Sequence, residues 1–477
     1  MSNTTIVWFR RDLRLHDNPA WNHAVNEGGP IVPVYIHCPK EERPWQPGEA
    51  SNWWLHHALA DLDSQLAEHG LKLIIRDAKT TQQALEEIIH ESDAHTVCWN
   101  RCYEPIIVKR DKQVKKMLQE SDIEAHSFNG SLLLDPLKIA NKSDKPYQVF
   151  TPFWKHCRDF EIAEPETANL KKSKAKKVES NALESLNLLP EIPWDKGMQD
   201  FWKPTREGGM KLLKKTAKKS KDYDAQRDIP IEDGTSRLSP YLHFGQISPR
   251  EFFHHIRDNA PSKEKADTGV LRQLYWREFS AHLLFHFPHS QDSALKPEYE
   301  QFPWDFNEKF LRAWQKGETG FPIVDAGMRQ LWHTGWMHNR VRMIAGSLLV
   351  KHLLQPWQEG ARWFWDTLVD ADLPNNSMGW QWVGGCGADA SPYFRIFNPI
   401  TQGEKFDPDG DYVRKWIPEL AELPKEFIHI PWGAPAEALK AAGIELGKDY
   451  PEPIFTHKEG RQRALDAYEK FKEIKES

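Results

Sequence analysis

Five short apolar runs alternate with longer amphipathic segments over roughly the first 130 residues of this 477-residue chain. A parallel sheet with crossover helices produces this alternation, because each crossover places a helix between two strands. The nearly continuous apolar character of the runs implies a sheet covered on both faces. We therefore predict a Rossmann-like α/β domain over 1–135, with strands at 6–10, 31–37, 71–76, 95–99 and 124–128.

Ligands of such sheets bind beyond the carboxyl ends of the strands. The segment RRDLRLHDNPAW (10–21) follows the first run and contains no G-x-G-x-x-G motif. Pro19 suits the first turn of a helix, which the side chain of Asp17 or Asn18 can cap. A standard dinucleotide site is therefore disfavoured in this domain.

The chain is longer than one hydrophobic core usually supports, so at least two domains are expected. Its composition turns polar and lysine-rich after the first domain, and we predict an interdomain linker over 136–200. Beyond the linker, apolar residues recur with helical spacing, as in 248–259 and in the aromatic run 268–287. The second domain, 201–477, is predicted to be all-α.

Ten of the 21 tryptophans lie between Trp276 and Trp382. An aromatic-rich helical core is the simpler explanation, although each buried indole N–H then needs a hydrogen-bond partner. The alternative is a relay of indoles between a redox cofactor and the surface, with other indoles serving as platforms for nucleobases. The density of tryptophan alone leaves both explanations open.

Composition narrows the class of protein. The longest apolar runs are far shorter than the roughly 18 residues that span a bilayer, and the N-terminus shows no export signal. The cysteines fit neither a disulfide framework nor a metal site; they are Cys38, Cys98, Cys102, Cys157 and Cys386. We expect a cytoplasmic protein with no metal and no membrane partner.

The net charge of -6 does not exclude nucleic-acid binding, because a local basic face is sufficient. Two lysine-rich stretches are candidates, NLKKSKAKK (169–177) and KLLKKTAKKSK (211–221). The first is more typical of a solvated linker than of a phosphate-binding arm. The second has helical spacing and could follow a phosphate backbone or face water. Neither decides whether the protein binds DNA.

Two segments of the second domain suit a nucleotide ligand. In DGTSRLSPYLHFGQISP (233–249), hydroxyl side chains and one arginine precede a helix that Ser248 can cap, an arrangement that favours phosphate oxygens. Further along, Gln273, Trp276 and Arg277 fall three and four residues apart, so an amide, an indole and a guanidinium share a helical face. A base could stack on that face.

Asn339 and Met343 also share a helical face, and Arg342 points to a neighbouring one. A buried Arg342 needs a carboxylate, for which Asp370 and Asp372 are the candidates. Such a pair is either an ordinary interhelical salt bridge or, beside a flavin, a device that tunes the charge on its redox-active nitrogen.

Six longer segments carry a resemblance to a known family. They are WFRRDLRLHDNPA (8–20), DGTSRLSPYL (233–242), WREF (276–279), TGFPIVDAGMRQLWHTGWMHNRVRM (319–343), DADLPNNSMGWQW (370–382) and SPYFRIFNPITQGEKFDPDG (391–410). Together they resemble the photolyase and cryptochrome family across nearly the whole chain. The resemblance implies an α/β antenna-binding domain and a helical domain that holds FAD in a folded conformation. The stretch 370–410 is most similar to the class III branch of the cyclobutane dimer photolyases.

The resemblance assigns FAD contacts residue by residue. Contacts to the phosphates and the ribitol fall on Tyr223, Thr235, Ser236, Arg237, Leu238, Ser239, Arg277 and Trp336. Arg342 and Asp370 form a pair beside the isoalloxazine, and Asp372 also lies at the flavin. Asn376 faces flavin N5, where an amide suits a photolyase, because plant cryptochromes carry aspartate and animal cryptochromes cysteine at the matching place.

A photoreduction relay is also implied, from Trp380 nearest the flavin through Trp357 to Trp304 at the surface. Tryptophan stands at all three places, so the relay becomes the favoured explanation of the tryptophan density.

The resemblance further implies a pocket for the pyrimidine dimer. Trp276 and Trp382 fall at its stacking walls. Asn339 provides a polar contact and Met343 a soft one. Arg227 and Gln402 fall near the DNA backbone. The (6-4) photolyases place histidines at 339 and 343, and DASH-type cryptochromes usually place tyrosine at 382, so both branches are disfavoured. Gln273 departs from the pattern, since most dimer photolyases carry glutamate there. An amide can donate a hydrogen bond to a thymine carbonyl but cannot deliver a proton, so we expect repair with a lowered quantum yield.

The antenna is less constrained. Ile106 and Ile107 stand where some bacterial photolyases hold a folate with an Asn-Glu pair. Methenyltetrahydrofolate, bound in another manner, is the favoured expectation, and a deazaflavin or no antenna are the alternatives.

The implied activity is that of a deoxyribodipyrimidine photo-lyase, a carbon–carbon lyase that acts on DNA containing pyrimidine dimers. Photoexcited reduced FAD passes an electron to a dimer flipped out of the duplex, as photolyases do in general; the cyclobutane ring opens and the electron returns. A cryptochrome-type photoreceptor with weak or no repair, because of Gln273, is the alternative. A flavin electron-transfer protein unrelated to DNA is a third. We expect a monomer.

Overall fold

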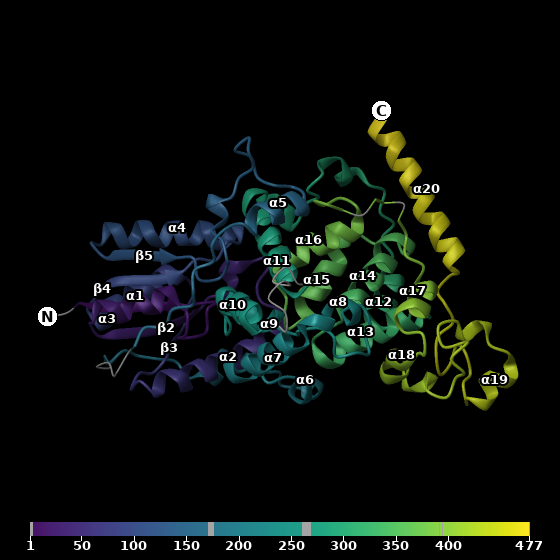
Figure 1. Ribbon diagram of the computed structural model, residues 1–477, viewed down its shortest axis with the longest axis horizontal. Coiled ribbons are helices and arrows are strands. Elements are labelled where there is room, and N and C mark those ends of the chain that lie inside the picture. Colours follow the sequence, from purple (N-terminus) through teal and green to yellow (C-terminus); the bar gives the residue numbers. More distant parts are fainter. Residues whose placement is uncertain (1–2, 170–175, 260–268, 391, 394, 477) are drawn as a thin grey trace.

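The computed structural model describes residues 3–169, 176–259, 269–390, 392–393 and 395–476. A parallel sheet with its helices forms one end of the molecule, and helices make up the rest (Figure 1). The predicted fold class is therefore confirmed. Most of the lysine-rich stretch 169–177 lies outside the described residues.

The sheet has five parallel strands in the order β3-β2-β1-β4-β5. They are β1 (Thr4–Phe9), β2 (Ile31–His37), β3 (Ile74–Asp77), β4 (Ala94–Asn100) and β5 (Glu124–Phe128). Ile6 of the central strand pairs with Val32 on one side and with Val97 on the other. All five predicted strands are present. β3 starts later than predicted, because the backbone N–H of Leu73 donates to Asp63 Oδ1 at 2.7 Å instead of to a neighbouring strand.

Helices cover both faces of this sheet, as its apolar strands predict. They are α1 (Pro19–Glu27), α2 (Glu49–Ala67), α3 (Thr81–Ser92) and α4 (Pro105–Glu120). Alternate residues of β1 enter different cores: Val7 belongs to one buried cluster and Trp8 to another. Asn18, one of the two predicted caps, caps α1 by accepting the Trp21 N–H at 3.1 Å.

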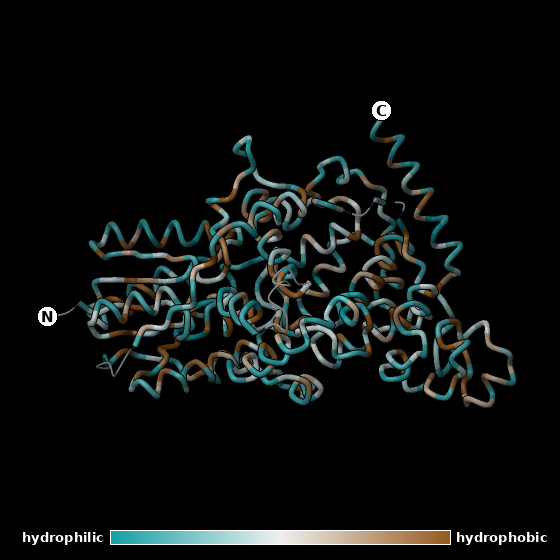
Figure 2. The backbone as a smooth tube through the Cα atoms, viewed as in Figure 1, coloured by the Kyte–Doolittle hydropathy of each residue, from teal (hydrophilic) through white to brown (hydrophobic). Residues whose placement is uncertain are grey.

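The second half of the chain folds into helices. They are α6 (Lys196–Phe201), α7 (Arg206–Lys219), α8 (Tyr223–Gln226), α9 (Ser239–His243), α10 (Pro249–Asn259), α11 (Gly269–His286), α12 (Glu308–Lys316), α13 (Pro322–Thr334), α14 (Asn339–Ser347), α15 (Trp357–Thr367), α16 (Leu373–Gly384), α17 (Pro399–Phe406), α18 (Asp411–Trp416), α19 (Ala436–Ala441) and α20 (His457–Glu476). Ser248 caps α10 as predicted, since its Oγ accepts the Glu251 N–H at 2.9 Å. Most residues of α20 are hydrophilic, and this helix lies at the edge of the molecule (Figure 2).

The segment predicted as a linker is only partly one. It contains α5 (Phe150–Cys157), whose buried residues recur with helical spacing and pack on α11. The Phe153 and Phe279 rings lie 5.2 Å apart, and the Tyr147 N–H donates to His282 Nε2 at 3.0 Å. Composition conceals this helix, because it is a short, largely apolar run within a longer polar stretch of sequence.

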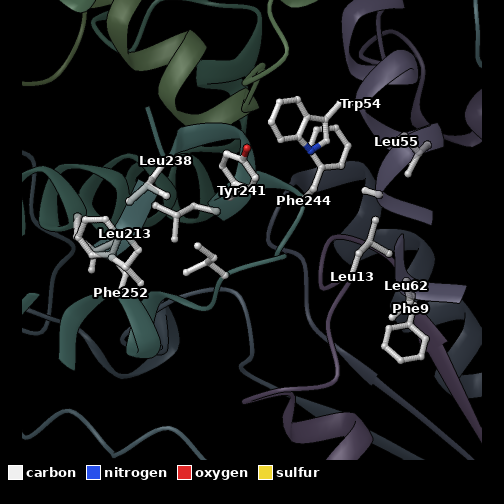
Figure 3. Close-up of a cluster of buried hydrophobic side chains, with 14 of the residues drawn as sticks. Phe9, Leu13, Trp54, Leu55, Leu62, Leu213, Leu238, Tyr241, Phe244 and Phe252 are labelled. Carbon is white, nitrogen blue, oxygen red and sulfur yellow. The ribbon is translucent and has the colours of Figure 1, made fainter. Parts of the chain in front are cut away.

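One hydrophobic core joins the sheet to the helical half. Figure 3 shows Trp54 and Leu55 of α2 in the same buried cluster as Tyr241 and Phe244 from beyond residue 200. The indole of Trp54 lies 4.9 Å from the Tyr241 ring, edge to face, and its Nε1 donates to Gln246 Oε1 at 2.9 Å. This shared core holds the helices that line the candidate site against the sheet.

Within the described ranges, no helix is both long and apolar enough to cross a membrane.

Candidate active site

A cavity of about 550 Å³ opens among helices α8, α9, α11, α14, α15 and α16. Most of the residues singled out in the sequence line it: Tyr223, Arg227, Thr235, Ser236, Arg237, Ser239, Gln273, Trp276, Arg277, Trp336, Asn339, Arg342, Met343, Asp370, Asp372, Asn376, Trp380 and Trp382. Convergent polar groups in one large cavity are typical of a cofactor or substrate site. The structure thus brings together segments that lie up to 160 residues apart in the sequence.

An ion pair between Arg342 and Asp370 stands in the wall of this cavity. The Arg342 Nη2 lies 3.0 and 2.9 Å from the two carboxylate oxygens, and Arg342 Nε donates to the Met337 carbonyl at 2.8 Å. The Ser239 hydroxyl donates to Asp370 Oδ2 at 2.6 Å. The predicted pairing is present, and the carboxylate is held by a guanidinium and a hydroxyl from two different helices.

Asp372 is a second fixed negative charge. It caps α16 by accepting the Asn375 N–H at 3.2 Å, and its other oxygen lies 3.3 Å from His243 Nδ1. Burial opposes ionisation of this carboxyl, but the hydrogen bond and charge of His243, with the charge of Arg277, hold its pKa well below the usual range. Sequence reasoning did not single out His243 or Asn375. The signal for His243 is its position four residues after Ser239, one turn along α9.

Asn376 lines the cavity with its amide in a defined orientation. Its Nδ2 donates to the Ala361 carbonyl at 2.9 Å. A carbonyl oxygen only accepts, so the amide nitrogen must face Ala361, which leaves Oδ1 as the atom available to another donor. The residue therefore offers its Oδ1 as a hydrogen-bond acceptor, and one N–H of its amide is occupied inside the protein.

Two indoles, Trp276 of α11 and Trp382 of α16, line the cavity and are half-buried. Asn339 and Met343 line the same cavity, and their Nδ2 and Sδ atoms are 3.9 Å apart. Gln273 lines the same cavity, and its Nε2 donates to the Gly269 carbonyl at 3.0 Å, within α11 itself. One of its amide protons is therefore occupied inside the protein.

Arg277 connects the cavity to the sheet domain. Its Nη1 donates to the carbonyl of Ser131, which lies just after β5, at 2.8 Å. The neighbouring Glu278 accepts the Leu134 N–H at 3.2 Å. Burial raises the pKa of Glu278 to about 7, although the charge of Arg277 opposes the shift. The cavity wall and the loop after β5 are thus tied at two adjacent residues of α11.

Two of the expected contacts lie outside the cavity lining. The Leu238 side chain is fully buried in the shared core, so only its backbone remains for a ligand (Figure 3). Gln402 lies on α17 and does not line this cavity.

The three relay tryptophans divide between two cavities. Trp380 is 4% exposed and lines the large cavity. Trp357 and Trp304 line a second cavity of about 300 Å³. Trp357 is buried and Trp304 is half-exposed. Trp380 also packs edge to face on Trp314, at 5.9 Å between ring centroids. Trp304 is therefore the most exposed of the three, and their order as a relay stays a prediction.

Among the residues that the structure describes, no group of three or more metal-ligating side chains is present.

The chain matches two protein-family models, "DNA photolyase" over residues 5–171 and "FAD binding domain of DNA photolyase" over residues 270–470. It is 47% identical to a deoxyribodipyrimidine photo-lyase of Agrobacterium fabrum, over 97% of each chain. It is 40% identical to cryptochrome-2 of Arabidopsis thaliana, over 99% of this chain and 80% of that one.

The solved structure of a bacterial class III photolyase from Agrobacterium tumefaciens superimposes with a TM-score of 0.94 at 45% identity. The match covers 99% of this chain and 98% of that one. Identity at this level over whole chains, with both family models matched in order, shows common descent as well as a common fold. The chain therefore belongs to the DNA photolyase and cryptochrome family.

Proposed function

We propose that this protein repairs cyclobutane pyrimidine dimers in DNA by light-driven electron transfer from reduced FAD. One observation carries the proposal: a single cavity is lined both by the residues expected at the flavin and by the two indoles expected at the dimer. A cofactor and a dimer held in one cavity lie in contact, and short-range electron transfer needs such contact. The similarity to the Agrobacterium photo-lyase supports the same activity.

The lining residues fit FAD. Thr235 and Ser236 bring hydroxyl donors, and Arg237 and Arg277 bring cationic ones, to the lining of the cavity, which suits the diphosphate. When bound and reduced, FAD supplies the electron that opens the cyclobutane ring after absorbing blue light.

The residues around the isoalloxazine would set its charge and orientation. The Arg342–Asp370 pair presents a compensated charge, so it can orient polar groups of the ring without adding a net charge. Asn376 leaves its Oδ1 free to accept a hydrogen bond from the N–H at flavin N5. This acceptor favours the reduced cofactor, which carries a proton there.

The dimer would enter the cavity from a locally opened duplex. A dimer stacks poorly on its neighbours, so its extrusion costs less than that of normal bases. Trp276 and Trp382 then offer apolar walls, and Asn339 and Met343 offer a polar and a soft contact. Arg227 at the rim, with Gln402 on α17, would contact the DNA backbone, which makes binding salt-dependent.

Trp380, Trp357 and Trp304 would return electrons from the surface to the cofactor. Trp380 lines the large cavity, and Trp357 lines a second, smaller one together with the more exposed Trp304, which supports this role.

We further propose a light-harvesting antenna in the α/β domain, with methenyltetrahydrofolate as the favoured chromophore. A photolyase from Sulfolobus tokodaii is described with two FAD molecules, which imply a novel light-harvesting cofactor in that protein. Release of the bound chromophores from purified protein and their identification by mass spectrometry tests this point. Detection of a deazaflavin, or of FAD alone, would contradict the folate.

The alternative function is that of a blue-light photoreceptor. Gln273 and the 40% identity to a plant cryptochrome favour it. Blue-light repair of an oligonucleotide with one thymine dimer, by purified and photoreduced protein, separates the two functions. Restored thymines in the light and none in the dark would support the photolyase. Tight lesion binding without repair would support the photoreceptor.

A further inference from the structure

Phe150, the first residue of α5, lies flat against Trp276. The two ring centroids are 3.5 Å apart and the ring planes differ by 7°. Phe150 is 1% exposed, so the contact excludes water. One face of the Trp276 indole is therefore covered by phenylalanine, although the indole still lines the large cavity.

The first turn of α5 also contacts the segment that follows α16. The Phe150 N–H lies 3.4 Å from the carboxylate of Asp389, which follows the helix that carries Trp382. The guanidinium of Arg272 lies 5.6 Å from the Phe150 ring and 4.8 Å from the Trp154 ring. Phe150 thus contacts both the Trp276 ring and a cation that also lies over Trp154.

We propose that Phe150 is a positioning residue for lesion recognition, and that it fixes the Trp276 indole in the orientation in which its free edge and face meet the dimer. This inference rests on the proposed function of Trp276 and deepens it. A half-buried indole without such support would sample several rotamers, and binding would have to order it at a cost in affinity. A preformed stack removes that cost before the dimer arrives.

Phe153 provides the matched control. It lies one turn along α5, is fully buried, and packs on Phe279 at 5.2 Å and on His282 at 5.3 Å. Its ring anchors the same helix to α11. If α5 only packs on α11, changes at Phe150 and at Phe153 should have the same effect on lesion recognition. If Phe150 positions Trp276, only the change at Phe150 should weaken lesion recognition.

The experiment compares the affinity of the FAD-loaded protein for duplex DNA with and without one thymine dimer. We expect Phe150→Leu to weaken dimer binding by about 3- to 10-fold, the range that one aromatic stack supplies, and to leave undamaged-DNA binding unchanged. Phe153→Leu should lower the thermal midpoint of unfolding as much as Phe150→Leu does. It should leave the ratio of dimer affinity to undamaged-DNA affinity unchanged. Phe150→Met, whose long and flexible side chain can fill the space without a planar ring, gives the same test if Phe150→Leu does not fold.

A double-mutant cycle with Trp276→Leu separates this inference from the proposed function. We expect Phe150→Leu to have no further effect on dimer affinity once the indole is absent. Unchanged dimer affinity in Trp276→Leu alone would contradict the role of Trp276. Two results would overturn only the positioning role, provided that Trp276→Leu weakens dimer binding. One is an unchanged ratio of damaged to undamaged DNA affinity in Phe150→Leu. The other is a double variant in which the effects of the two single changes simply add.

Discussion

The polar side chains of the large cavity differ in how many of their hydrogen bonds the protein already satisfies. Asp370 is held by Arg342 and Ser239, whereas Gln273 uses one amide proton on the Gly269 carbonyl of its own helix. Gln273 can therefore still donate one N–H to a ligand. A glutamate there could not donate to Gly269, and repulsion from that carbonyl would turn it toward the cavity.

We predict that Gln273→Glu raises the quantum yield of dimer repair by about 2- to 10-fold, the range of one hydrogen bond worth about 0.5–1.5 kcal/mol. A carboxyl can carry a proton to the electron-rich dimer, which an amide cannot. The measurement is repaired thymine per absorbed photon under single-turnover light. Gln273→Leu, which has no polar group, should repair less than the natural protein. A Glu variant that repairs no faster than the natural protein would show that the amide is already sufficient.

Glu278 predicts a pH dependence of stability. Burial raises its pKa in the folded protein to about 7, above the value of 4.5 in an unfolded chain. As pH rises from 4.5 to 7, the unfolded chain loses this proton first, so the folded state loses stability over that range. We expect Glu278→Gln to gain stability relative to the natural protein by up to about 3 kcal/mol between pH 5 and 8. Denaturant unfolding at both pH values measures the difference; a constant difference would contradict the raised pKa.

Sequence motifs predict the residues that line the cavity better than they predict the residues that hold those side chains in place. The residues from Thr235 to Ser239, the Arg342–Asp370 pair and Asn376 were all found in the sequence, because long family motifs fix their positions in the chain. His243 and Phe150 were not. Their roles arise from contacts between distant segments, 129 residues apart for His243 and Asp372, and no local pattern records such a contact.

At the scale of elements, the strand predictions succeeded because β1, β2 and β4 are mostly buried and each is a separate apolar run, whereas β5 is partly exposed and more polar. The linker prediction missed α5, because this helix is only eight residues long and its apolar residues lie within a longer polar stretch of sequence. The close approach of α15 to α16 was also invisible in the sequence. It depends on Gly360, where an added Cβ would stand 2.1 Å from the ring of Trp380.

We therefore predict that Gly360→Ala separates α15 from α16 and displaces Trp380, at a cost of about 1–3 kcal/mol. Thermal unfolding measures the loss, and the flavin content of the purified protein reports the displacement at the cavity. Gly346→Ala is the matched control, because its Cβ would stand 3.6 Å from the same indole on the α14 side, an ordinary contact. Equal losses in the two variants would show that the fit against Trp380 does not matter.

At the scale of the whole molecule, the sheet and the helical half share one core and are not merely linked. Trp54 of α2 contacts Trp202 at 5.2 Å and Tyr241 at 4.9 Å, both edge to face, and both residues belong to the helical half. A second core, which contains Trp99, lies on the other face of the sheet. The shared core implies that loss of the sheet removes support from the cavity as well.

We predict that Trp54→Ala lowers the free energy of unfolding by about 3–5 kcal/mol, and that sheet and cavity still unfold together. The loss is large because the change opens a void and leaves Gln246 Oε1 without its indole donor. Far-UV circular dichroism reports the backbone and flavin release reports the cavity, and the two midpoints in urea should coincide. Trp99→Ala should shift both midpoints as well, although Trp99 lies in the core remote from the helical half. If flavin release keeps its natural midpoint in Trp99→Ala while the backbone signal moves, the two halves are energetically independent, and the contact through Trp54 only orients them.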